Sequence, residues 1–451
     1  MYITMRQSIL SAIAMMWYSI VPASAQTYTL SQLTDSAQAT NISIRNARHD
    51  IESASEQRKE AFTNYFPNVS ATGLWFNANK GMAETTVNPS EVLPQSLGAT
   101  LASSLPPEAL ADLANPINVS MMKHGTIASI TAVQPVFAGG QIVNGNKLAR
   151  VGEDVSLLQL QLSENEVEKT TSQYFWQAVI LQEKMKTVAA AEKLLSGLNN
   201  DVAVAVKAGV TNRNDLLQVQ LRQNEIESQK LKLTNGLSVI KLLLAQHCGL
   251  RDTSFALAYT MEAMPALPLK HNHREALAST AEYRLLDKQV EAAELQHRLA
   301  VGKNLPNVAI GAGYNYHNML GNDHTFAMVF ATVSIPISAW WGGSHAMKRQ
   351  KIQLDKAQQQ LSDNSEKLII RMQKAWNDVE EAHHQLAIAQ RSIEQAGENL
   401  RLNIDYYHAG TSTMSDLLQA QMLHQQALDS RVDAWADYQI KLLEYQQAVG
   451  Y

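Results

Sequence analysis

The sequence contains one short motif twice, which we call the repeated phrase, and the two copies have the same residue spacing. Val206–Gln220 reads VKAGVTNRNDLLQVQ and Tyr407–Gln421 reads YHAGTSTMSDLLQAQ, so both contain A-G-x-x-x-x-x-D-L-L-Q-x-Q. A proline precedes each copy, and the interval Pro135–Asp215 is as long as the interval Pro336–Asp416. Self-similarity at so long a constant spacing predicts a chain built from two copies of one structural repeat.

Proline is absent from residues 136–264 and from every position after Pro336. Because proline interrupts helices, these stretches predict long uninterrupted helices. We expect them over residues 141–206 and 343–407, each roughly 100 Å long at the rise of an α-helix. Helices of that length are typical of coiled coils rather than of compact globular domains.

The second long helix carries a seven-residue hydrophobic period, which predicts supercoiled packing. Two interleaved rows share that period: Leu354, Leu361, Leu368, Ala375, Ala382, Ala389 and Ala396, and Met372, Val379, Leu386, Ile393 and Leu400. Shorter helices are expected beside each long one, at Ser31–Tyr65, Asp215–Cys248, His273–Lys303 and Met414–Val449.

The repeated phrase lies where a long helix turns back into a shorter one. Gly209 and Gly410 suit the left-handed residue that ends a helix. In the second turn, Ser412 or Thr413 can cap the helix that follows, as Thr211 or Asn212 can in the first.

Short segments with a period of two lie between the helices and predict β-strands. In Val308–Tyr316, apolar and aromatic residues alternate with small and polar ones, and Phe326, Met328 and Phe330 share one face of the next segment. The first repeat alternates less clearly. Strands are expected at about residues 68–78, 126–137, 307–318 and 325–337.

The first strand pair is separated by many more residues than the second. The surplus, about residues 78–123, is rich in proline and has no counterpart in the second repeat. It predicts a long loop at a hairpin tip that tolerates change, with a short helix opened by Pro107.

The N-terminus predicts export. Arg6 is the only charge before the apolar stretch Ile9–Val21, and Ala23–Ala25 supplies a small-residue cleavage pattern. Residues 1–25 therefore read as a signal peptide rather than as a membrane anchor. The mature chain is expected to begin at Gln26.

Composition excludes several classes of function. The formal net charge of −5 argues against a nucleic-acid partner. Cys248 is the only cysteine, which excludes an intramolecular disulfide and a Cys-rich metal site, and we expect it to be buried and inert. The pairs His383–His384 and His271/His273 lack ligand partners at suitable spacing. No nucleophile–base set stands out, so neither cofactor, metal nor catalysis is expected.

The predicted fold is mainly α with a small β part, in two repeats of helix, two strands, long helix and helix. The parts are a signal peptide (1–25), a first repeat (26–249), a linker or equatorial segment (250–271) and a second repeat (272–451). Four strands in one chain would leave open edges, which are costly in lipid. Two copies would give eight strands and enclose little more than side chains, whereas three copies give twelve and leave a lumen.

This doubled pattern resembles the TolC-like outer-membrane efflux family over essentially the whole mature chain. The resemblance lies in the order and spacing of PNV before a strand, PVFAGGQ after one, and AGT followed by SDLLQAQ at a helix turn. It implies a homotrimer in outer-membrane lipid, with a 12-stranded β-barrel continued by a long α-helical barrel into the periplasm. It also implies a periplasmic adaptor (membrane fusion) protein and an inner-membrane transporter as partners, in efflux or type I secretion.

The resemblance assigns roles to the helix turns. Asp416 matches a family position where three acidic side chains face the axis at the periplasmic aperture, and Gln419 stands where the family has a second acid. Gly209, Arg213, Asp215, Gly410 and Ser412 lie at the turn tips that gate the channel and dock the adaptor. Some members pair a basic residue near Ser412 with an acid at Asp215, and Arg213 offers another pairing here. A lone helix-capping role is the alternative for both aspartates.

Two other classes fit part of the pattern. A coiled-coil structural protein of the envelope would have the long helices, but it would not need strands with a period of two. A periplasmic adaptor would have one long helical hairpin flanked by small β domains, whereas this chain has two equal halves.

Overall fold

The computed structural model describes most of the chain, and the expected signal peptide and Pro107 lie outside the described residues. Those residues are 26–92, 94, 97, 100, 104–106, 108, 115–261, 264–319 and 322–451. The chain divides into two compact units. Unit 1 contains the residues up to Ala54, Gly152–Val290 and Ala357–Tyr451, and unit 2 contains Ser55–Val151 and Glu291–Lys356.

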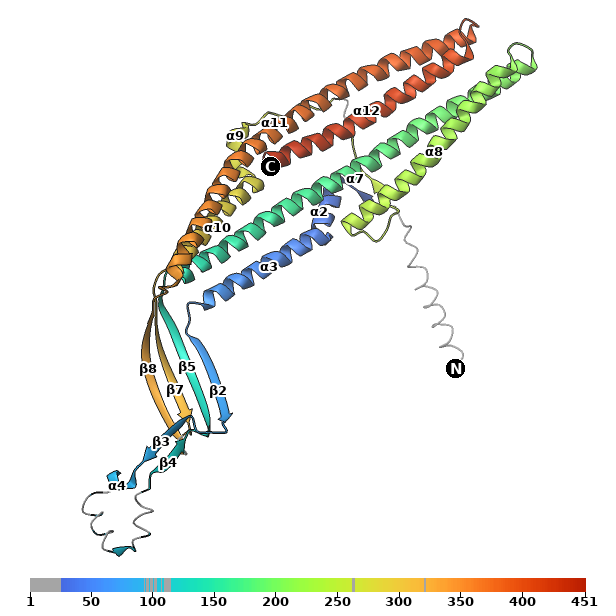
Figure 1. Ribbon diagram of the computed structural model, residues 1–451. Coiled ribbons are helices and arrows are strands. Elements are labelled where there is room, and N and C mark those ends of the chain that lie inside the picture. The colour runs from blue at the N-terminus through green and yellow to red at the C-terminus, as the bar shows by residue number, and fades with distance from the viewer. Residues whose placement is uncertain are drawn as a thin grey trace, which may run out of the picture. The chain divides into compact units, whose positions relative to one another are not determined.

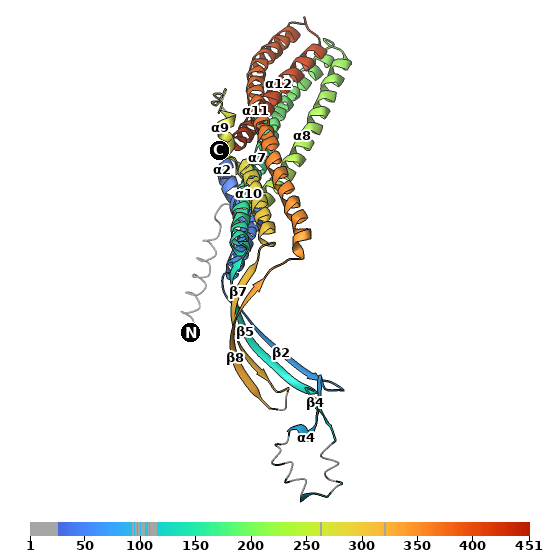
Figure 2. The same cartoon turned by 60° about the vertical axis from the view of Figure 1, so that its left-hand side comes forward.

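Unit 2 is built around a four-stranded sheet to which both repeats contribute. Its strands are β2 (Asn68–Asn77), β5 (His124–Ala138), β7 (Asn307–His317) and β8 (His324–Ser334). They are ordered β2-β5-β7-β8, every neighbouring pair is antiparallel, and they curve together in both views (Figures 1 and 2). Strands β2 and β8 therefore form the two edges of the sheet.

The register places one set of residues on a single face, because directly paired residues point to the same side. Ala71 pairs with Ile130, Ile130 with Tyr314, and Tyr314 with Ala327. We call this the apolar face; its members are Val69, Ala71, Gly73, Trp75, Ala128, Ile130, Ala132, Val308, Ile310, Ala312, Tyr314, Tyr316, Ala327, Val329, Ala331 and Val333, with Thr126, Gln134 and Thr325 nearer its ends. None of these residues is charged. Val329 is 85% exposed and Trp75 is 71% exposed, so the chain alone leaves this face uncovered.

The opposite face, which we call the mixed face, is more polar and also carries aromatic side chains. It carries the Thr72 hydroxyl, which lies 2.7 Å from the Ser129 hydroxyl. The ring of Phe330 lies over Gly311, where a Cβ atom would collide with it. Glycine in β7 thus makes room for the aromatic side chains of β8.

The surplus in the first repeat is partly ordered as a second hairpin, which corrects the expectation of a plain loop. Strands β3 (Ala83–Val87) and β4 (Ile117–Met121) pair antiparallel, and the short helix α4 spans Pro89–Val92. The hydroxyl of Thr86 donates to the side-chain oxygen of Asn118 across the pair. Regular pairing here was not visible because neither strand alternates strongly.

The two prolines used to align the repeats occupy different environments. Pro135 lies within β5, where the register with β7 shifts between Pro135 and Phe137, beyond the end of pairing with β2. Strand β8 ends at Ser334, before Pro336, although the sequence predicted it to continue to 337. Proline lacks an N–H donor, so it is accommodated only at a bulge or outside the ladder.

The helices confirm the long proline-free spans. They are α2 (Leu30–Thr40), α3 (Ile42–Thr63), α7 (Gln141–Lys207), α8 (Arg213–Cys248), α9 (His273–Ala276), α10 (Ala281–Gly302), α11 (Ala339–His408) and α12 (Met414–Ala448). Within unit 1, α7 with α8 and α11 with α12 form two long hairpins (Figure 1). Every residue of the two heptad rows is buried or half-buried.

Two helices predicted as continuous are interrupted. The first breaks at Asn41, whose backbone is extended and whose side-chain oxygen accepts from the N–H of Ser43. The second is split into α9, a 3-10 turn (Leu277–Ser279) and α10. The break at Asn41 lets α2 pack on the end of α8, where the hydroxyls of Ser36 and Thr40 donate to the carbonyl of Cys248.

Unit 1 also contains a parallel pair of very short strands, β1 (Thr27–Tyr28) and β6 (Ala256–Leu257). Cys248 lies in the adjoining core, fully buried as expected, and burial raises the pKa of its thiol to about 12. None of the described helices is both long enough and apolar enough to cross a membrane.

Candidate functional site

The two helix turns of the repeated phrase have nearly identical backbones. Gly209 and Gly410 both have φ of +74°, a left-handed conformation that glycine adopts without strain. The N–H of Val210 donates to the carbonyl of Ala205 at 2.9 Å, and that of Thr411 donates to the carbonyl of Tyr406 at the same distance. These are the hydrogen bonds of a glycine-terminated helix, so the repeated A-G encodes the turn.

The caps after the two turns differ. Asn212 caps α8, and its side-chain oxygen accepts from the N–H of Asp215 at 3.0 Å. Thr413 caps α12, and its hydroxyl accepts from the N–H of Asp416 at 3.2 Å. The alternatives for the caps are thereby resolved in favour of the residue nearer to each helix.

Asp416 completes a capping box with its own helix start. Its Oδ2 atom accepts from the Thr413 N–H at 3.1 Å and from the Thr413 hydroxyl at 2.6 Å, and the Ser412 hydroxyl lies 3.5 Å away. Hydrogen bonds from the Thr413 side chain and then from its backbone lower the pKa of Asp416 below its usual value. The carboxylate is therefore held ionised and in one place, while remaining exposed.

Gln419 lies one turn further along α12 and is also exposed. Residues three apart on a helix share a face, so Asp416 and Gln419 point to the same open side of the hairpin. The structure thus brings together the two residues expected at the aperture.

Asp215 is more enclosed than its counterpart. It is half-buried, and its carboxylate accepts a short hydrogen bond from the Thr211 hydroxyl. Tyr407, from the other hairpin, lies close by: burial raises the pKa of its phenol first, and the negative charges of Asp215 and Asp201 raise it further. Asp215 therefore faces the second hairpin, whereas Asp416 is exposed and bonds within its own turn.

The pairing considered for Arg213 is not formed. Within the described part of the chain, Arg213 is exposed at the first residue of α8 and makes no ion pair. Ser412 places its hydroxyl 3.4 Å from the Asn403 side-chain oxygen. Among the residues that the structure describes, no basic side chain forms an ion pair with Asp416.

Hydrophobic packing joins the two turns. Val202, Val219 and Met414 are almost fully buried together, at 1%, 0% and 2% exposure, with Tyr407 and Leu418 packed against them. Met414 is the first residue of α12 and reaches the first hairpin. Movement of one turn away from the other must open this core.

A buried polar network, which the sequence reasoning missed, lies a few turns from the tips. The guanidinium of Arg222 on α8 donates to the side-chain oxygens of Gln421 at 3.1 Å and Gln425 at 3.3 Å on α12. Gln425 in turn donates to Gln229 at 3.0 Å. Gln421 and Gln425 are 4% and 7% exposed, so separating the hairpins would leave buried amides without partners.

The repeated phrase contained one signal for this network. Its final glutamine is Gln220 in the first copy and Gln421 in the second, but only Gln421 is buried and bonded to the opposite hairpin. Because both copies end in the same residue type, the sequence alone did not show that the two glutamines have different environments.

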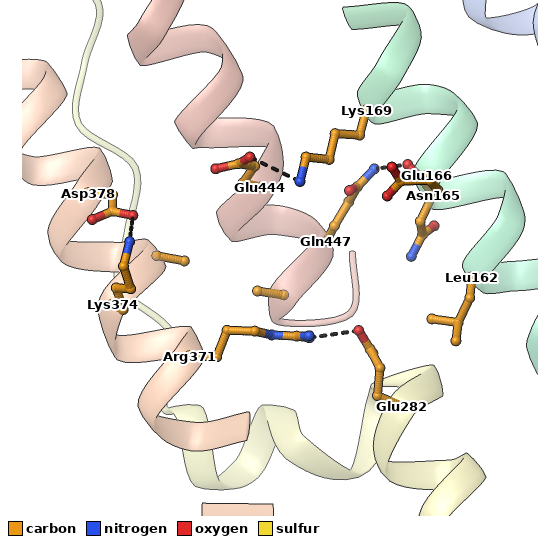
Figure 3. A pocket seen from close by; sticks show the side chains of 12 residues that line it. Leu162, Asn165, Glu166, Lys169, Glu282, Arg371, Lys374, Asp378, Glu444 and Gln447 are labelled. Atoms are coloured by element: carbon orange, nitrogen blue, oxygen red, sulfur yellow. Dashed lines mark hydrogen bonds and ion pairs between the residues drawn. The ribbon is translucent and has the colours of Figure 1, made fainter. Parts of the chain in front are cut away.

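A charged pocket of about 390 Å³ lies in unit 1 among α7, α10, α11 and α12 (Figure 3). Arg371 pairs with Glu282 at 2.6 Å, Lys374 with Asp378 at 2.5 Å, and Lys169 with Glu444 at 3.2 Å. Burial alone would raise the pKa of Glu444, but hydrogen bonds from Lys441 and Lys169 outweigh it and lower that pKa. The pocket lining contains neither His, Cys nor a hydroxyl side chain. The Arg371–Glu282 and Lys169–Glu444 pairs connect different helices, whereas Lys374–Asp378 lies within α11.

No three His, Cys, Asp or Glu side chains among the described residues are placed together to hold a metal ion. The residues at the turns offer hydrogen bonding and charge rather than a nucleophile.

Comparison with known proteins defines the class. The fold is shared with outer-membrane channel proteins of solved structure: VceC from Vibrio cholerae (TM-score 0.72, 14% identity, covering 93% of this chain and 96% of that one), OprN (0.76, 15%, 93% and 89%) and CusC (0.77, 13%, 94% and 93%). No curated protein matches the chain by sequence.

A family model matches the C-terminal part of the chain. Residues 273–451 match the model described as outer membrane efflux protein, and the described chain shares the fold of the TolC-like channels. The resemblance inferred from the repeated phrase is therefore confirmed. The match also places the protein among outer-membrane proteins with a role in efflux.

Proposed function

We propose that the protein is the outer-membrane exit channel of a tripartite efflux system, a passive conduit for small molecules delivered by a periplasmic adaptor and an inner-membrane transporter. The observation that carries this proposal is the sheet of unit 2, which combines an uncharged apolar face with two unpaired edges. The exposed apolar face is unfavourable in water, and unpaired strand edges are unfavourable in lipid.

Closure with further copies removes the bare edges. The strand directions alternate across β2-β5-β7-β8, so β8 of one copy can pair antiparallel with β2 of the next. Three copies of a four-stranded sheet give 12 strands, a barrel wide enough for an aqueous lumen, whereas two copies give only eight. We therefore propose a homotrimer.

The apolar face has the dimensions and composition of a lipid-facing band. Strands β2, β7 and β8 have 10, 11 and 11 residues, and a tilted transmembrane strand needs about 9–11. The mixed face, with its serine, threonine, asparagine and glycine residues, then lines the lumen.

Exposed aromatic residues gather beside one end of this band. Phe62 contacts the rings of Tyr65 and Phe66 just before β2, and Trp340 and Trp341 follow β8. Trp341 is 77% exposed, and the Trp340 indole donates to the carbonyl of Asn304 at 2.9 Å. Aromatic residues with one polar contact are typical of the boundary between lipid and water, which supports a periplasmic membrane surface here.

The turns of the helical hairpins are proposed as the periplasmic entrance. Under threefold symmetry three copies of Asp416 would approach one axis, with Gln419 beside them. No basic side chain in the described part of the chain pairs with Asp416, so such a ring would keep its negative charge and favour cations. The core around Met414 and the Arg222 network would hold the entrance closed, and adaptor docking at the tips would separate the hairpins.

The proposal is tested with the full mature chain in detergent. Native mass spectrometry should give a mass of three chains, and insertion into a planar bilayer should give discrete, cation-favouring conductance steps. A stable monomer that needs no detergent would instead support a coiled-coil structural protein of the envelope.

Expressing the protein in cells that lack their own exit channel distinguishes a role in efflux from a role in protein secretion. Restored resistance to small toxic compounds, dependent on a matching adaptor and transporter, supports efflux. Restored export of a polypeptide without any change in resistance would mean that the channel serves a type I secretion system.

A further inference from the structure

Two histidines face each other at the hairpin end of β7 and β8. His317 is the last residue of β7 and His324 the first of β8, and the two are direct cross-strand partners. Their ring centroids lie 5.2 Å apart at an interplanar angle of 50°. Two imidazoles sharing one ion in a tetrahedral arrangement, with metal–nitrogen bonds of about 2 Å, have centroids roughly 5 Å apart.

The surroundings of this pair lack a competing partner. The Nδ1 atom of His317 is buried and has no hydrogen-bond partner in the described structure. The nearby carboxylate of Asp323 accepts instead from the Tyr316 hydroxyl at 2.8 Å, on the opposite face of the sheet. The Phe326 ring lies 6.3 Å from His317 and 6.0 Å from His324 and provides an apolar wall.

A thioether lies on the same face of the sheet. Asn318 exchanges hydrogen bonds with Thr126, its N–H donating at 3.2 Å and its side-chain oxygen accepting at 2.6 Å. This continues the β5–β7 register by one residue, so Met319 falls opposite Gly125 and on the face of His317. A Cβ at Gly125 would lie 3.2 Å from Met319 Cγ, which shows that Met319 covers the space left by that glycine.

We propose that His317, His324 and Met319 form a binding site for a soft monovalent metal ion, Cu(I). Two neutral imidazoles and a thioether carry no charge, which suits a monovalent ion with an apolar wall, and sulfur ligands select Cu(I) over harder divalent ions. The described residues place no group of three His, Cys or acidic side chains here, and we assign the third donor to the sulfur of Met319, which follows His317 by two residues on the same face.

The site lies on the mixed face of the sheet. If that face lines the lumen, as proposed above, a trimer would carry three such sites near the hairpin end of its barrel. This placement rests on the proposed function, whereas Cu(I) binding by one chain does not. The two ideas can therefore fail separately.

The test measures Cu(I) binding by the purified full mature chain in detergent, in competition with a chromophoric Cu(I) chelator under reducing conditions. We expect one Cu(I) per chain. His317→Ala and His324→Ala should each abolish stoichiometric binding, and Met319→Leu should weaken it by at least about tenfold. His124→Ala is the matched control, because His124 lies at the same end of the sheet but pairs with Asn77 on the apolar face.

X-ray absorption of the bound copper distinguishes the assigned ligands from others. The wild-type spectrum should contain nitrogen and one sulfur scatterer, and the sulfur should disappear in Met319→Leu. Gly125→Ala, which crowds Met319, should reduce the sulfur contribution while both histidines are intact. Absence of Cu(I) binding by the wild type, binding that survives in the double variant His317→Ala/His324→Ala, or a sulfur signal unchanged in Met319→Leu would each overturn the proposal.

Discussion

The α7–α8 and α11–α12 turns share the repeated phrase, yet their aspartates lie in different surroundings. Both have a left-handed glycine with φ of +74° and a capped helix start. Asp215 is half-buried and faces Tyr407 of the other hairpin, whereas Asp416 is exposed and bonded only within its own turn. The two turns therefore share one backbone conformation, while the exposure of their aspartate side chains differs.

The caps show how this divergence is built. The Thr413 N–H donates to the Asp416 carboxylate, and the Asp416 N–H donates to the Thr413 hydroxyl. These two hydrogen bonds fix the carboxylate over the helix start. In the first turn Asn212 performs the cap, and the Asp215 carboxylate bonds to Thr211 instead. The different residues before the shared Asp thus set which hydrogen bonds orient each carboxylate.

The largest functional difference between the two turns is expected at their aspartates. In planar bilayers we expect Asp416→Ala to abolish most of the cation selectivity and to weaken block by divalent or trivalent cations, because the proposed ring of charge would be removed. Asp215→Ala, the matched control, should change both much less. Unchanged reversal potential and block in Asp416→Ala would mean that the aspartate acts as a helix cap alone.

The turn glycines should behave alike. Gly209→Ala and Gly410→Ala each force an L residue into the left-handed region, and we expect each to cost about 1 kcal/mol of local stability. Hydrogen–deuterium exchange at the two turns should speed up correspondingly. Gly197→Ala is the control, since Gly197 lies inside α7 with free space around it and should be neutral or stabilising. A strong effect at one turn glycine alone would show that the turns differ in backbone and not only in side chains.

The ionisation of Asp416 predicts a pH dependence. Its folded pKa is lowered, so its stabilising contribution is present above the unfolded value of 3.8 and is lost as pH falls through the lower folded pKa. The difference in melting temperature between the wild type and Asp416→Asn should be constant near neutral pH and shrink below about pH 4. A difference that instead shrinks between pH 7 and about pH 5 would contradict a lowered pKa.

The smallest effect on assembly is expected from a deletion in the surplus segment, which is present only in the first repeat. Deleting Glu91–Leu113 removes part of a surplus that the second repeat lacks, and trimer assembly should survive because the four-stranded sheet is untouched. Trimer yield on native gels measures this. Loss of folding would show that the segment braces or plugs the barrel.

Local signals predicted the elements well wherever the pattern was long. Long helices, glycine turns and the alternating face of β7 follow from periodicity and residue type. The breaks at Asn41 and at the 3-10 turn Leu277–Ser279 were missed because they involve distant residues. Asn41 bonds to the His247 carbonyl near the end of α8, and the Ser279 hydroxyl bonds to the Val449 carbonyl. The pairs β1–β6 and β3–β4 are too short for a periodic signal.

The site was predictable only in part. The turns and both aspartates could be identified from the repeated phrase and the family resemblance. Arg222 could not be linked to Gln421, because the two are 199 residues apart and both lie in ordinary helical sequence. The unequal burial of Asp215 and Asp416 likewise depends on which hairpin lies beside each, which no single segment specifies.

Pairing of β5 with β7 has a consequence for the time course of biogenesis. Thr126 and Asn318, bonded across that pair, are 192 residues apart, and this ladder is the one that joins the two repeats in the sheet. At about 5–20 residues per second, the first hairpin is synthesised roughly 10–40 s before its partner exists. During that interval its open strand is a template for aggregation, so we expect the nascent chain to depend on a periplasmic holding factor until the second half arrives.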